Sequence, residues 1–256
     1  MSAAAARYAR PISASAEVHW VAGVDGCRGG WFVILCALAK GADLPVRVTS
    51  RLCGDFRSVL DLPEQPVVIA VDMPIGLLER AIPGGRVCDR EARALLRRPR
   101  ASSVFTPPTR PGLAAATYLD APALNGAGMS KESFNILPKI REIDAVVSAA
   151  DQERVFEAHP ELVFARLAGA PLSHNKKTME GRRERARLLR RVYRTSYQEP
   201  VRLRLTHGLR YIALDDVADA YALAHAARCI RNGGARRVPE NNPPIDARGL
   251  RMEIWY

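Results

Sequence analysis

Two short apolar runs that each end in an aspartate limit what this chain can fold into. The first is VAGVDGCRGGW at residues 21–31, and the second is VVIAVDMPIG at residues 67–76. A continuous apolar run that stops at a turn is typical of a strand buried on both faces of a sheet. If the two runs form neighbouring parallel strands, Asp25 and Asp72 reach the same edge of the sheet, where open α/β sheets bind ligands.

The order of the other expected elements favours a sheet covered by helices. A Gly-rich turn at residues 26–30 indicates a hairpin between the first two strands. The pattern as a whole predicts a mixed α/β layer with helices on both faces. Strands are expected at residues 18–24, 31–38, 46–52, 67–71 and 153–158, helices at 89–98, 130–150 with a break at Pro138, 160–169, 178–195 and 215–231, and a loop at 99–112.

The acids at the expected sheet edge point to a divalent cation. Two carboxylates held close together repel each other and acquire raised pKa values unless a cation lies between them. Oxygen-only ligands favour Mg²⁺ or Mn²⁺. Glu157 falls near the end of the fifth expected strand. Asp216 and Asp219 stand three residues apart, so both project from one face of the last helix.

Each acid also has a purely structural interpretation. An aspartate after a strand often hydrogen-bonds a turn, as Asp25 and Asp72 both could, and Glu157 could be an exposed strand residue. The helix acids could be solvated residues that interact favourably with the helix N-terminus, with Asp215 as its cap. We favour a shared site because the last helix is otherwise small and apolar, so acids on a helix that must pack need a partner.

A series of distinctive segments follow one another in order over nearly the whole chain beyond its first residues. They are GVDGCRGGW at 23–31, VDMPIGL at 71–77, CDREAR at 88–93, SSVFTPPTR at 102–110, LPKIREID at 137–144, FEAHPELVFARL at 156–167, NKKTMEGRRER at 175–185, DDVADAYALA at 215–224 and GLRMEIWY at 249–256. In these segments the chain resembles the DUF429 family of predicted nucleases with an RNase H-like fold.

The resemblance implies three antiparallel strands followed by two parallel ones, in the sheet order 3-2-1-4-5. It implies a single RNase H-like domain over residues 19–256 with helical insertions. Residues 1–18 are rich in Ala, Ser and Arg and lack the apolar segment of a secretory signal. We expect these residues to form a disordered tail, with an organellar transit peptide as the alternative.

The resemblance also implies a site. Nucleases of this superfamily carry acids at the end of strand one, at or after strand four, and on the last helix. Asp25, Asp72 and Asp219 stand at those places. The implied activity is hydrolysis of phosphodiester bonds that depends on Mg²⁺ or Mn²⁺ bound by these three residues. Asp216 is a further candidate ligand, and Glu157 a further candidate catalytic or supporting group.

His159 is close in sequence to Glu157, in the segment EAHPE. Its imidazole could relay protons or guide product release at the site. The alternative is that it caps the helix that begins at Pro160.

A formal net charge of +11 favours a polyanionic partner, and we expect nucleic acid, either DNA or RNA. A basic segment at residues 174–194 could follow a phosphate backbone, or it could be a solvated helix that pairs with acids elsewhere. The candidate nucleic-acid-binding residues are Lys176, Lys177, Arg182, Arg183, Arg185 and, near the Pro-rich loop, Arg110.

Two other functions compete with a nuclease. One is a nucleic-acid-binding protein without catalysis. The other is an actin-like ATP-binding phosphotransferase, because Asp25-Gly26 faintly resembles the phosphate-binding turns of that class. The five scattered cysteines favour reduced thiols in the cytoplasm, and no apolar run approaches the roughly 18 residues of a membrane span.

Overall fold

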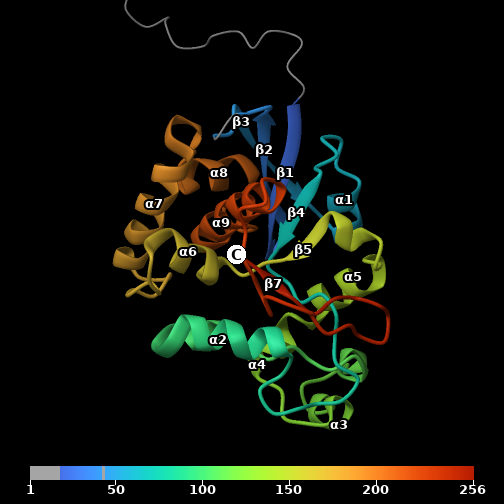
Figure 1. Ribbon diagram of the computed structural model, residues 1–256. Helices are drawn as coiled ribbons and strands as arrows, with labels where there is room; N and C mark the ends of the chain where they lie inside the picture. The colour runs from blue at the N-terminus through green and yellow to red at the C-terminus, as the bar shows by residue number, and fades with distance from the viewer. Residues whose placement is uncertain (1–17, 42–43) are drawn as a thin grey trace, which may run out of the picture.

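The computed structural model describes residues 18–41 and 44–256, and a five-stranded sheet lies at its centre (Figure 1). The sheet order is β3-β2-β1-β4-β5, in which β1, β2 and β3 are antiparallel and β4 and β5 run parallel to β1. The predicted mixed α/β sheet and its order 3-2-1-4-5 are therefore confirmed. The strands are β1 (Val18–Cys27), β2 (Gly30–Ala39), β3 (Arg47–Cys53), β4 (Val68–Val71) and β5 (Val155–Glu157).

Helices cover both faces of the sheet, as predicted (Figure 1). One face packs against α6 (Pro160–Ala168), α7 (Met179–Tyr193), α8 (Pro200–His207) and α9 (Leu214–Arg231). The other packs against α1 (Phe56–Leu60) and α5 (Leu137–Val146). Beyond the carboxyl ends of β1 and β4 lie α2 (Val87–Arg100), α3 (Ala121–Asn125) and α4 (Lys131–Asn135).

The last helix, α9, lies directly on β1 because Gly23 has no side chain. A Cβ built at Gly23 would lie 2.0 Å from the Ala224 nitrogen and 2.2 Å from the Ala220 oxygen. Small residues on α9 complete this close approach, since Ala220 and Ala224 are fully buried. The contact brings the N-terminal half of α9 next to the carboxyl end of β1.

Several predicted boundaries needed correction. The helix expected over residues 130–150 divides near Pro138, as predicted, into α4 and α5, but it ends at Val146. Ser130 caps α4, also as predicted, by accepting a hydrogen bond from the Ser133 nitrogen. Pro138 stands in the first turn of α5, where its missing N–H costs nothing. The fifth strand is shorter than expected because residues 151–153 form a 3₁₀ turn.

The chain also ends in elements that its pattern did not predict. A short hairpin of β6 (Arg237–Val238) and β7 (Ile254–Trp255) follows α9. Trp255 bridges to Ala158 in parallel, so the end of the chain lies beside β5 (Figure 1). The predicted tail lies outside the described residues, except for Val18, which begins β1.

Among residues 18–41 and 44–256, no helix has both the length and the apolar character needed to cross a membrane.

Candidate functional site

The parallel pairing of β1 and β4 places Asp25 and Asp72 at equivalent positions. Val24 stands opposite Val71 in the ladder, and the Asp72 nitrogen donates a hydrogen bond to the Val24 oxygen at 3.1 Å. Each aspartate follows one member of that pair, so both side chains leave the sheet on the face that carries α9. The buried Asp25 and the half-buried Asp72 therefore meet at the carboxyl edge of the sheet, as the sequence predicted.

Helix α9 adds Asp219, which is 1% exposed, to this edge. Asp216 lies one turn earlier, where its Oδ2 accepts a hydrogen bond from the Ala213 nitrogen at 2.7 Å. Asp216 therefore caps the start of α9, a role that the sequence had suggested for Asp215. We call Asp25, Asp72 and Asp219 the acid cluster.

The members of the acid cluster influence one another electrostatically. Burial raises the pKa of Asp25 well above its usual range, and the charges of Asp219, Asp72 and Asp216 raise it further. Burial likewise raises the pKa values of Asp72 and Asp219. These shifts show that ionising all three carboxylates together is unfavourable unless a cation compensates them.

A lysine supplies the positive charge at the acid cluster. Lys176, from the loop between α6 and α7, donates a hydrogen bond from Nζ to Asp219 Oδ2 at 2.6 Å. Asp219, and more weakly Asp25 and Asp72, raise the pKa of this ammonium group. The other Asp219 oxygen, Oδ1, is buried and has no hydrogen-bond partner in the described part of the chain.

The donor chemistry of the acid cluster suits a hard divalent cation. All its ligand atoms are carboxylate oxygens, and the unpartnered Asp219 Oδ1 is a free acceptor at a site that needs positive charge. The described residues nevertheless contain no group of three or more His, Cys, Asp or Glu side chains already placed to hold a metal ion. Ion binding would therefore require these side chains to converge and Lys176 to leave Asp219.

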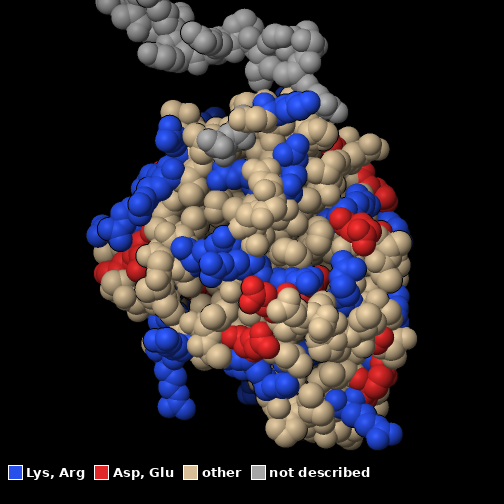
Figure 2. All heavy atoms as spheres, viewed as in Figure 1, with Lys and Arg blue, Asp and Glu red and all other residues tan. Residues whose placement is uncertain are grey.

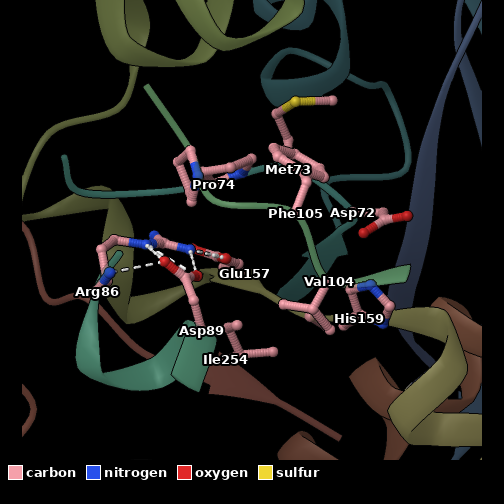
Figure 3. Close-up of a pocket in the computed structure, with 12 residues that line it drawn as sticks. Asp72, Met73, Pro74, Arg86, Asp89, Val104, Phe105, Glu157, His159 and Ile254 are labelled. Carbon is pink, nitrogen blue, oxygen red and sulfur yellow. Dashed lines mark hydrogen bonds and ion pairs between the residues drawn. The ribbon is translucent and has the colours of Figure 1, made fainter. Parts of the chain in front are cut away.

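Glu157 does not belong to the acid cluster. It stands opposite Val71 in the β4–β5 ladder, so its side chain leaves the sheet on the face opposite to that of Asp72. There Arg86 donates hydrogen bonds to both of its oxygens, at 2.6 and 2.7 Å, and Arg86 also pairs with Asp89 (Figure 3). The Ile75 nitrogen is a third donor, at 2.7 Å. These contacts give Glu157 a structural role in holding the turn after β4.

Replacing Arg86 with methionine should destabilise the fold strongly. The guanidinium is 2% exposed and lies between two buried carboxylates, which would remain without a counter-charge. Removing one partner of a buried ion pair typically costs about 3–5 kcal/mol. Urea unfolding would measure the loss, with the exposed Arg187 replaced by methionine as the control. A loss as small as that of the control would show that the ion pairs of Arg86 with Asp89 and Glu157 contribute little to the stability of the fold.

His159 lies close to Asp72, because both residues line one small cavity, and a protonated imidazole there would lower the pKa of the Asp72 carboxyl group. Figure 3 shows both residues on the same side of this cavity, which measures about 20 Å³, away from Arg86 and its partners Asp89 and Glu157. The Nε2 atom lies 3.2 Å from the Ser103 oxygen, whereas Nδ1 is buried without a partner among the described residues. The side chain makes no capping hydrogen bond to α6. A role as proton relay stays a prediction.

Comparison with protein-family models gives a match to the part of the chain that contains these elements. The family model described as "Protein of unknown function (DUF429)" matches residues 23–243. The chain belongs to the DUF429 family. The matched region begins in β1 and continues beyond α9, so it contains every member of the acid cluster and Lys176. Searches among curated proteins and among solved structures gave no significant match.

The basic residues of this DUF429 protein divide into two groups. Lys177, Arg182 and Arg183 are exposed, and Lys and Arg side chains gather over α7 and α8 at the left of Figure 2. Arg185 is instead buried, and its Nη2 atom pairs with Glu161. Arg110 pairs with Glu79, Asp144 and Asp246, so its guanidinium holds three segments together.

Glu161 is a neighbour of the acid cluster that the sequence did not single out. It is buried, its charge raises the pKa values of both Asp72 and Asp219, and its Oε2 is unpartnered in the described chain. The helix dipole alone can explain a glutamate in the first turn of α6. The sequence signal that could have identified Glu161 is that it stands on a helix whose neighbouring residues are almost all apolar.

Proposed function

We propose that this DUF429 protein is a metal-dependent hydrolase of phosphodiester bonds in nucleic acid. The supporting observation is the acid cluster, in which residues far apart in sequence bring three carboxylates to the carboxyl edge of the sheet. The strand order and the positions of these acids agree with those implied by the resemblance to RNase H-like nucleases. Asp25, Asp72 and Asp219 are the proposed ligands of Mg²⁺ or Mn²⁺, and Asp216 caps α9 beside them.

A bound divalent cation would stabilise negative charge on the phosphate and lower the pKa of a bound water. The chain itself holds the carboxylates at the sheet edge and excludes water from Asp219. Lys176 is one-third exposed at its side chain, so it can turn from Asp219 toward a phosphate oxygen. The exposed Lys177, Arg182 and Arg183 stand on the same segment and can bind the phosphates of a strand.

The proposal is tested by incubating the protein with labelled single-stranded DNA, duplex DNA, RNA and a DNA junction. Cleavage should require Mg²⁺ or Mn²⁺ and should stop on addition of EDTA. Absence of metal-dependent cleavage of all four substrates, together with no metal binding by calorimetry, would overturn the proposal.

A nucleic-acid-binding protein without catalysis is the second candidate, and one contact favours it. Lys176 already neutralises Asp219, so the acid cluster has a counter-charge without a metal. This candidate requires binding that weakens steeply with salt and does not change with divalent cations. The actin-like phosphotransferase has no comparable support from the described contacts.

Replacing Lys176 with methionine should separate the two candidates. Without metal, the variant should lose roughly 1–3 kcal/mol of stability, because Asp219 would be buried without its partner. Mg²⁺ should restore that stability, and the rise in melting temperature on adding Mg²⁺ should exceed the rise in the wild type. Lys177→Met is the matched control, since the Lys177 side chain is exposed. A Lys176→Met variant that Mg²⁺ does not stabilise would support the candidate without catalysis.

A further inference from the structure

A second cavity lies beside the acid cluster, between α7, the start of α8 and the start of α9. It has a volume of about 250 Å³. Small-molecule sites usually measure roughly 300–1,000 Å³, so this cavity suits a ligand about the size of a single nucleotide rather than a larger one. Lys176 lines it and also pairs with Asp219, so the cavity opens directly next to the acid cluster.

The lining of the cavity is strongly basic. Arg182 and Arg183 line it, are exposed, and have no ion-pair partner within the described residues. Arg190 lies there too but pairs with Glu199 at 2.6 Å. Guanidinium groups bind phosphate through paired hydrogen bonds, so the two free arginines favour a phosphate group.

Two buried polar atoms of lining residues lack partners among residues 18–41 and 44–256. One is Nε of Arg185, a residue that is 1% exposed and whose other nitrogens bond to Glu161, His174 and Gly181. The other is the hydroxyl of Tyr197. Buried donors without acceptors are costly and uncommon, and a polar ligand that reaches them would remove this cost.

Apart from the carboxylates of Asp215 and of Glu199, which pairs with Arg190, the rest of the lining is largely apolar. Met179 and Val201, which are 58% and 57% exposed, supply apolar surface to the cavity. Leu214, Ala218 and the ring of Tyr197 continue this surface. A flat apolar group can pack against it, as nucleobases stack on aromatic rings.

We propose that this cavity binds one nucleotide of a nucleic-acid strand, with its phosphate on Arg182 and Arg183 and its base against Met179 and Tyr197. The inference rests on the proposed function, because Lys176 links the cavity to the acid cluster. A strand with one nucleotide held here continues past Asp219, so the cavity would place a neighbouring phosphodiester bond at the acid cluster.

Binding of adenosine 5′-monophosphate, measured by calorimetry in EDTA, tests the inference without requiring catalysis. It should bind more tightly than inorganic phosphate or adenosine, and a short adenine oligonucleotide should compete with it. Arg182→Gln with Arg183→Gln should weaken binding by roughly tenfold or more, since two charge-assisted contacts are lost. Arg187→Gln with Arg191→Gln removes the same charge from exposed positions on α7 outside the cavity lining. This double variant should change the affinity for adenosine 5′-monophosphate much less.

Met179→Glu should also weaken binding, because it replaces an apolar contact with a negative charge at an exposed position where the fold tolerates it. Equal losses in the two double variants, or binding no tighter than that of inorganic phosphate, would overturn the inference. If the protein cleaves nucleic acid but does not bind adenosine 5′-monophosphate, only the proposal for the cavity is wrong. If the protein binds adenosine 5′-monophosphate as expected but cleaves no nucleic acid, the proposal for the cavity stands and the proposed hydrolase activity is wrong.

Discussion

Asp25→Asn is expected to abolish metal-dependent cleavage. Asp25 is a proposed ligand buried between β1 and α9, and a neutral amide binds Mg²⁺ far more weakly than a carboxylate does. Changing a residue that only orients a metal ligand typically lowers metal affinity or activity about 10–100-fold. Loss of a ligand itself should therefore lower activity by more than roughly a hundredfold. Initial rates of cleavage at saturating Mg²⁺ would measure the effect, together with calorimetry of Mg²⁺ binding.

Stability measurements separate loss of the site from loss of the fold. The raised pKa of Asp25 means that its ionised form destabilises the folded state, so Asp25→Asn should melt at the same temperature as the metal-free wild type or higher. Asp61→Asn, at an exposed position after α1, is the control and should keep full activity. Full activity in Asp25→Asn would end the metal hypothesis, whatever its melting temperature.

Gly23→Ala is expected to have the largest effect on stability. The added methyl carbon would lie 2.0 Å from a backbone nitrogen and 2.2 Å from a backbone oxygen of α9. Overpacking by side chains usually costs about 1–3 kcal/mol, but helix backbone cannot rotate away, so we expect a loss above roughly 4 kcal/mol. Urea unfolding followed by circular dichroism would measure it. Displacing α9 would also move Asp219 from Asp25 and weaken Mg²⁺ binding.

Gly54→Ala is the matched control. A Cβ at Gly54 meets no atom within 4 Å, and the residue does not require a positive φ. This variant should unfold within about 0.5 kcal/mol of the wild type, as is usual for surface changes. If Gly23→Ala were equally mild, the close contact between β1 and α9 could not be what positions the acid cluster.

Local patterns predicted the strands of the central sheet well. The apolar runs that end at Asp25 and Asp72 became β1 and β4, because burial on both faces leaves a signal within a few residues. Short elements such as α1 and the β6–β7 hairpin left no comparable signal. Their few residues depend on contacts with distant segments, such as the bridge between Trp255 and Ala158.

The sequence by itself determined which carboxylates reach the sheet edge, since Asp25 and Asp72 directly follow the buried apolar runs of β1 and β4 and Asp219 lies on the packing face of α9. Only the tertiary structure decided which charge each acid meets. Lys176 reaches Asp219 across 43 positions, and Arg86 reaches Glu157 across 71. Such pairings depend on how loops and helices pack around the sheet, and hydrophobic periodicity carries no information about them.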